Sequence, residues 1–101
     1  MIRHAANNEA ERVMVYGAAW CEDTAYIRRL LNQWGVAHHY IDIDKDEYAM
    51  EKVTRWNLGS LMTPVVSVGT LETPRLIAPT DAELHGMLYT AEGIRVGPLL
   101  L

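Results

Sequence analysis

The residue with the clearest chemical potential is Cys21, the one cysteine among the 101 residues of the chain. It follows a short apolar run at 13–16 that stops at Gly17, and it precedes a segment with helical periodicity. At the start of a helix, unpaired backbone N–H groups and the positive end of the helix dipole favour a thiolate. The thiolate is the nucleophile in thiol–disulfide exchange, so this position predicts a reactive thiol. A lone cysteine can also be a small buried hydrophobe, and the sequence leaves that interpretation open.

Two acidic residues, Glu22 and Asp23, follow the cysteine directly. Carboxylates suit a helix N-terminus, and this structural role alone is enough to explain them. Beside a thiolate they also repel its charge, which would raise the pKa of Cys21 against the effect of the helix dipole. The sequence does not decide which of these two effects is larger.

Hydrophobic periodicity predicts the elements that position Cys21. Apolar, β-prone runs predict strands at 13–16, 39–43, 65–68 and 75–78. One helix is expected after Cys21 and ends at Gly35, a second is capped by Asp44 or Asp46, and a third starts at Pro79. The apolar helical positions are Ile27, Leu30, Leu31 and Trp34, then Tyr48, Ala49, Val53 and Trp56, and finally Leu84, Met87 and Leu88.

The predicted order is β-α-β-α-β-β-α, which indicates an α/β fold with a four-stranded mixed sheet flanked by three helices. Strands separated by a helix are expected to run parallel through right-handed crossovers, whereas the short link 69–74 predicts an antiparallel hairpin. We expect a single domain over 1–101, with its core at about 13–90. The segment 91–101 has no assigned structure and can pack on the domain, mediate contacts or fray.

Composition and charge narrow the range of partners. The chain is 50% hydrophobic and 22% charged, as in ordinary soluble globular proteins. Its net charge of -4 and the lack of a basic stripe argue against nucleic acid and anionic membranes. The polar segment 1–12 does not resemble a signal peptide, and no apolar run approaches the roughly 20 residues of a membrane span. We therefore expect a cytoplasmic location. The single cysteine and the lack of a His-x-x-x-His pair argue against a metal site. We also expect a monomer or weak dimer.

The segment 16–24, with the sequence YGAAWCEDT, resembles the active-site segment of glutaredoxin-like proteins of the thioredoxin-fold superfamily. It is most similar to mycoredoxins and ribonucleotide-reductase redoxins, which carry a Tyr, a few small residues and then Trp-Cys-x-x-Cys. The segment 41–44 resembles the second strand of that family, 63–65 resembles its cis-proline motif, and 79–81 resembles the pair that opens its last helix. Four motifs in this order over about 13–90 imply the thioredoxin fold.

The resemblance also implies roles for individual residues. Pro64 would follow a cis peptide bond and, with Thr63 and Val65, would align the backbone of a substrate beside the cysteine. Thr80 and Asp81 would bind the polar end of a small thiol at a helix N-terminus.

Trp20 and Thr24 are expected to act on the Cys21 thiol or on its reactants. Trp20 is expected to shield the thiol or contact the partner rather than fill the core. Thr24 stands where the family has its second cysteine, so turnover would use one thiol, with the Thr24 hydroxyl donating a hydrogen bond to the thiolate. Many glutaredoxins also carry a Lys near Ala18, which this chain lacks. The expected co-substrate is therefore glutathione, mycothiol or a similar small thiol, with no tightly bound cofactor.

Two functions remain as hypotheses. In the first, Cys21 reduces mixed disulfides between proteins and a small thiol. In the second, the chain is a catalytically weak or inactive module that binds a thiol ligand or a partner protein. A third class, in which two subunits bridge an iron–sulfur cluster, is typical of relatives that read Cys-Gly-Phe-Ser, and the segment 21–24 reads CEDT instead.

Overall fold

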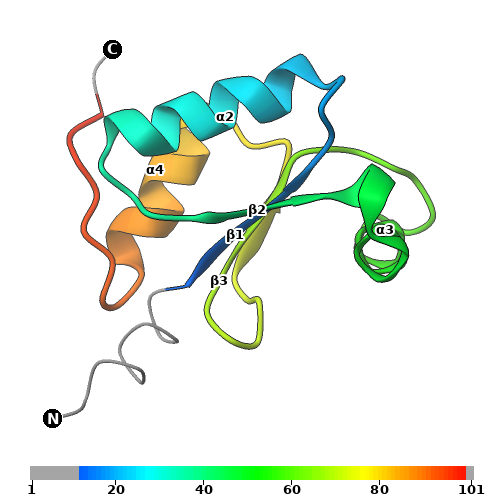
Figure 1. Cartoon of the computed structure of the whole chain (residues 1–101). Helices are drawn as coiled ribbons and strands as arrows, with labels where there is room; N and C mark the ends of the chain where they lie inside the picture. The colour runs from blue at the N-terminus through cyan, green and yellow to red at the C-terminus, as the bar shows by residue number, and fades with distance from the viewer. Residues whose placement is uncertain (1–11, 100–101) are drawn as a thin grey trace, which may run out of the picture.

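The computed structural model describes residues 12–99, and its elements follow the predicted order (Figure 1). Our expectations for the segment 1–11 and for the last two residues of the tail lie outside the described residues. The strands are β1 (Val13–Gly17), β2 (His39–Asp42), β3 (Val65–Val68) and β4 (Arg75–Ile77). The helices are α2 (Glu22–Gln33), α3 (Glu47–Trp56) and α4 (Asp81–Thr90), and the short 3-10 helix η1 (Ile43–Lys45) precedes α3. Within 12–99, no helix is both long and apolar enough to cross a membrane.

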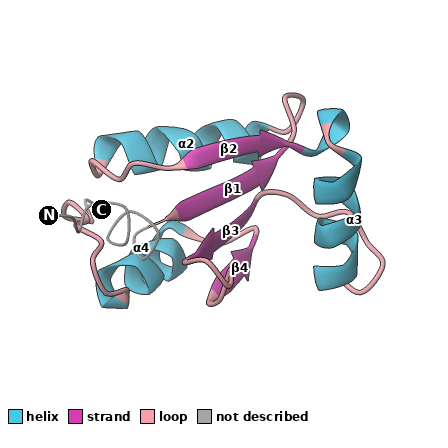
Figure 2. Ribbon diagram, turned by 60° about the horizontal axis from the view of Figure 1, so that its bottom comes forward, coloured by secondary structure: helices cyan, strands magenta, loops and turns pink. Residues whose placement is uncertain are grey.

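The four strands form one mixed sheet in the order β2-β1-β3-β4 (Figure 2). Strands β1 and β2 run parallel, and the β3–β4 hairpin is antiparallel, as predicted. The expectation of parallel strands around each helix is wrong for β3, which runs antiparallel to β1 with Val65 opposite Tyr16. The connection through α3 leaves β2 and enters β3 at the same end of the strands, the end at which β1 stops. This reversal brings the start of β3 next to the residues that follow β1.

Helices α2 and α4 lie on one face of the sheet and α3 lies on the other (Figure 1). Because strand side chains alternate between faces, the core has two parts. Under α2 and α4 it comprises Val13, Val15, Ile27, Leu30, Leu31, Trp34, Val36, Val66, Val68, Leu84, Met87 and Leu88. Under α3 it comprises Tyr16, Ala18, Ile43, Ala49, Val53 and Val65, and Cys21 packs against this second part.

The helix that follows β2 starts at the second of the two predicted caps. Asp46 accepts a hydrogen bond from the Ala49 N–H at 3.0 Å, so it is the N-cap of α3. Asp44 lies in η1 instead, and Ile43 begins that turn rather than extending the strand. Tyr48, although part of the apolar pattern, points away from the core and is 67% exposed.

The tail residues Ile94, Val96 and Leu99 pack against the core under α2 and α4. The Gly97 N–H donates to the Trp34 carbonyl oxygen at 2.8 Å, which holds the tail against the end of α2.

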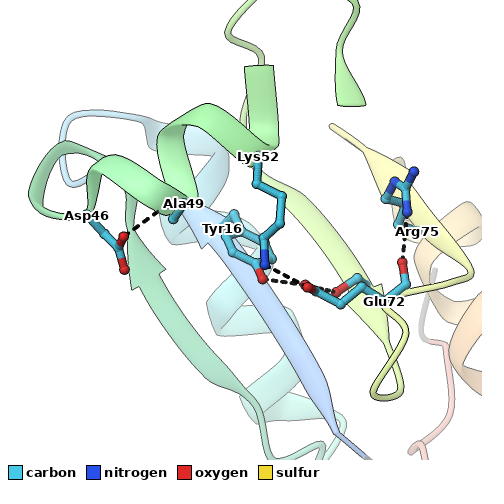
Figure 3. A network of polar contacts seen from close by, with 7 residues as sticks. Tyr16, Asp46, Ala49, Lys52, Glu72 and Arg75 are labelled. Atoms are coloured by element: carbon cyan, nitrogen blue, oxygen red, sulfur yellow. Dashed lines mark hydrogen bonds and ion pairs between the residues drawn. The ribbon is translucent and has the colours of Figure 1, made fainter. Parts of the chain in front are cut away.

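A polar network on the α3 side links β1 to the β3–β4 hairpin (Figure 3). The Tyr16 hydroxyl donates to the Glu72 carboxylate, which also accepts from the Lys52 ammonium at 2.7 Å and the Ser67 hydroxyl at 3.3 Å. Arg75 donates to the Glu72 carbonyl oxygen at 3.0 Å. Partial burial raises the pKa of Glu72, but the hydrogen bonds from Lys52 and Tyr16 outweigh it and hold that pKa below its ordinary value.

Candidate active site

Cys21 is the N-cap residue of α2, with extended backbone angles (φ -91°, ψ 115°). Its backbone N–H donates to the Ala18 carbonyl oxygen at 3.1 Å, which closes the turn between β1 and the helix. The protonated side chain makes no capping hydrogen bond, and the thiol is free and partly exposed. The sulfur lies 3.8 Å from the carbonyl oxygen of Thr63, to which the protonated thiol donates. The thiol is therefore at the helix start, as the sequence predicts, and accessible to a reactant.

The pKa of Cys21 lies below the ordinary thiol value. Partial burial raises it, but hydrogen bonds to the thiolate lower it by more. The strongest of these come from the side chains of Thr24 and Thr63, followed by the backbone N–H groups of Thr24 and Asp23. The S–H···O contact with the Thr63 carbonyl belongs to the thiol form and is lost on ionisation. The surroundings of Cys21 therefore favour the nucleophilic form.

Thr24 lies beneath the active-site loop, with its side chain 3% exposed. Its Oγ1 accepts a long hydrogen bond, 3.4 Å, from the Ala18 N–H. A Cβ atom at Gly17 would lie 2.4 Å from the Thr24 Cγ2 atom, so the glycine makes room for this side chain. The sequence predicts Gly17 only as the end of a strand, and no local pattern marks its contact with Thr24.

The Thr63–Pro64 peptide bond is cis and stands at the start of β3. The Pro64 carbonyl oxygen accepts from the Ala78 N–H at 2.7 Å, which fixes this turn to the end of β4. Thr63, Pro64 and Val65 are all buried, and both the carbonyl oxygen and the side chain of Thr63 lie beside Cys21. The structure thus brings the predicted proline motif to the cysteine.

Trp20 does not fill the core, because its side chain is 64% exposed. Its indole Nε1 donates to the Asp44 carboxylate at 2.8 Å. The Asp44 N–H in turn donates to the Asp42 side chain at 2.9 Å. The ring is thereby attached to η1 and lies in solvent next to Cys21. The sequence predicts Asp44 as a helix cap and as part of the segment 41–44, and gives no sign of its contact with Trp20.

Thr80 and Asp81 start α4, as predicted, and each already has a partner. Thr80 and Glu83 form a capping box, with reciprocal hydrogen bonds of 3.1 Å and 2.9 Å. The Asp81 carboxylate accepts from the Tyr26 hydroxyl at 2.7 Å. Tyr26 was not among the predicted site residues, because this pairing joins positions 55 residues apart.

A surface cavity of about 170 Å³ lies next to the cis-proline turn. Its walls are Asp23, Tyr26, Ile27, Pro64, Ala78 and Pro79. Asp23 and its neighbour Glu22 are both exposed at the first turn of α2. The cavity therefore lies between the start of α2, which carries Cys21, and the loop that leads into α4.

The fold and the site together define a thioredoxin-fold protein with a thiol at the start of α2. The glutaredoxin family model matches residues 13–71, and the chain belongs to the glutaredoxin family. This match includes Cys21, Thr24 and the segment 63–65, whereas Thr80 and Asp81 lie beyond it. Family membership indicates thiol–disulfide oxidoreductase chemistry that uses a small thiol.

The solved structure of the glutaredoxin (grx-1) from Archaeoglobus fulgidus is similar to this one, with a TM-score of 0.63. The two sequences are 24% identical over 84% of this chain and 94% of that chain. At this identity the likeness shows the fold alone, and it confirms the predicted β-α-β-α-β-β-α architecture. The sequence matches no curated protein.

Proposed function

We propose that this chain is a monothiol oxidoreductase that reduces mixed disulfides between proteins and a small thiol through Cys21. One observation carries the proposal: a free thiol with a lowered pKa stands at the start of α2, next to the cis Thr63–Pro64 bond. A thiolate in this position is both nucleophilic and accessible. Membership of the glutaredoxin family supports the same chemistry.

The reaction has two exchanges. In the first, the Cys21 thiolate attacks the small-thiol sulfur of the mixed disulfide, a new S–S bond forms, and the substrate protein leaves as a thiolate that takes up a proton. In the second, another small-thiol thiolate attacks the same sulfur and releases Cys21, so that the two small thiols end as a disulfide. The small thiol is the reductant. The second exchange is intermolecular because Thr24 stands where dithiol relatives have a cysteine.

The remaining residues position the reactants. Thr24 donates its hydroxyl to the thiolate, and backbone atoms of the segment 63–65 align the substrate. Thr80 and Asp81 bind the polar end of the small thiol, and Trp20 contacts the substrate protein over its exposed ring face. The small thiol is glutathione, mycothiol or a similar compound, and the reaction takes place in the cytoplasm without a bound cofactor.

The test measures the reduction of a peptide–small-thiol mixed disulfide by mass spectrometry, with glutathione and mycothiol as reductants in parallel. We expect the wild-type chain to accelerate the reaction and to carry one small thiol on Cys21 during turnover. Cys21→Ser should neither accelerate the reduction nor carry a small thiol. The double variant Cys21→Ser/Thr70→Cys moves the thiol to an exposed turn and should react no faster than a free cysteine. If the wild-type chain binds the oxidised peptide but does not accelerate its reduction, the chain is a binding module instead.

A further inference from the structure

The cavity next to the Thr63–Pro64 turn and the start of α2 has an acidic wall. Asp23 lines it directly, and Tyr26, which lines it too, donates its hydroxyl to the Asp81 carboxylate. None of the six lining residues is basic. A carboxylate in the wall and a second one behind the tyrosine give the cavity a negative potential.

Basic side chains near this wall do not reverse its charge. The Arg29 guanidinium lies 5.8 Å from the centre of the Tyr26 ring, outside the lining residues. At the Tyr26 hydroxyl, the hydrogen bond to Asp81 raises the pKa most, desolvation and the charge of Asp81 raise it further, and Arg29 lowers it by less. Arg28 stacks over the Tyr40 ring of β2 at 4.1 Å, away from this wall. The lining of the cavity thus carries one negative charge, that of Asp23, and no positive one.

We infer that this cavity selects small thiols whose far end carries a positive charge, such as an amine, over thiols that end in a carboxylate. The inference rests on the proposed function, because the ligand must be held as a mixed disulfide on Cys21 for its far end to reach Asp23. A volume of about 170 Å³ has room for a chain of several heavy atoms. The ammonium then lies within reach of Asp23 and Asp81, whereas a carboxylate in its place is repelled by both.

The test compares three symmetrical disulfides of similar length: cystamine, which is cationic, hydroxyethyl disulfide, which is neutral, and dithiodipropionate, which is anionic. In each reaction the Cys21 thiolate attacks one sulfur, forms the mixed disulfide and releases the other half as a thiolate. Mass spectrometry follows the rate, and each rate is divided by that of a free cysteine peptide with the same disulfide. This division removes the intrinsic reactivity of the reagents.

We expect the normalised rates to fall from cystamine to hydroxyethyl disulfide to dithiodipropionate. For charges roughly 5 Å apart in a water-like dielectric, each carboxylate should change the ratio between the two extremes about fifteenfold at low salt, so the two together should give a ratio of roughly 200. It should shrink as salt is added. Asp23→Asn and Asp81→Asn should each lower the ratio about fifteenfold. Glu92→Gln removes an equal charge from an exposed site beyond the far end of α4 and should leave the ratio unchanged.

The ratio is compared within one variant, so a change in the thiolate fraction of Cys21 cancels out. Equal normalised rates for all three disulfides would overturn the inference and leave the proposed function intact. The same holds if the charge preference survives both substitutions of the acidic wall. If Cys21 reacts with none of the reagents faster than the free peptide does, the proposed function fails, and this inference fails with it.

Discussion

Replacing Thr24 by valine removes a single hydroxyl from beneath the thiol and keeps the shape of a side chain that is 3% exposed. The structure assigns that hydroxyl the strongest hydrogen bond that lowers the pKa of Cys21. A hydrogen bond to a charged group is worth about 1.5–3 kcal/mol. Because Cys21 is partly exposed and water competes for the thiolate, we take the lower end of that range. The acid dissociation constant of the thiol should then fall about tenfold, since 1.4 kcal/mol corresponds to a factor of ten.

The assay is the rate of alkylation by iodoacetamide as a function of pH, which reports on Cys21 alone because the chain has one cysteine. Below the pKa, the rate is proportional to the thiolate fraction. Thr24→Val should therefore move the midpoint to higher pH and lower the rate on the acid side about tenfold.

Two control variants separate the hydroxyl from the packing. Thr24→Ser keeps the hydroxyl and removes the methyl group, so its alkylation midpoint should stay close to that of the wild type. Thr90→Val removes a hydroxyl that donates to the Gly86 carbonyl oxygen in α4, and it should change nothing at Cys21. An unchanged midpoint in Thr24→Val, with native stability confirmed by denaturant unfolding, would refute the assignment of the hydroxyl to the thiolate.

The other predictions concern stability. Gly17→Ala should destabilise the fold by about 2 kcal/mol in urea unfolding, because the new Cβ would lie 2.4 Å from Thr24, and an unchanged midpoint would contradict this contact. Gly86→Ala, the matched control inside α4, meets nothing within 4 Å and should stabilise by about 1 kcal/mol. The lowered pKa of Glu72 means that its stabilising effect is present above the ordinary carboxyl range and is lost as the pH falls through the folded-state value. Glu72→Gln should therefore cost about 1–2 kcal/mol at neutral pH and flatten the acid limb of the stability profile, whereas an unchanged limb would exclude the ion pair with Lys52 as its source.

The sequence alone predicted the parts of the fold that depend on neighbours along the chain. The apolar spacing of Ile27, Leu31 and Trp34 sets the buried face of α2, and Gly35, with φ of 73°, ends that helix as predicted. The position of Cys21 at the start of α2 was predictable for the same reason. The strand directions were less predictable. The prediction of a parallel crossover was wrong for β3, because periodicity does not say at which end of the strands the chain re-enters the sheet.

Several contacts of the candidate site join residues that are far apart in sequence, and no local pattern marks them. Trp20 meets Asp44 across 24 positions, and Cys21 meets Thr63 across 42. The Tyr26–Asp81 hydrogen bond depends on how α2 and α4 pack on the same face of the sheet. Such pairings are fixed by the packing of whole elements.

The amino-acid sequence by itself determined the element order, the cysteine at a helix start and the absence of a second thiol within this chain. These follow from side-chain type and from a helical or strand period that acts over a few residues. Only the tertiary structure decided the reversed direction of β3, which carries the Thr63–Pro64 turn to Cys21, and the acidic wall of the neighbouring cavity. Both depend on which faces are buried together, because the burial of apolar surface selects one arrangement of elements that local preferences leave undecided.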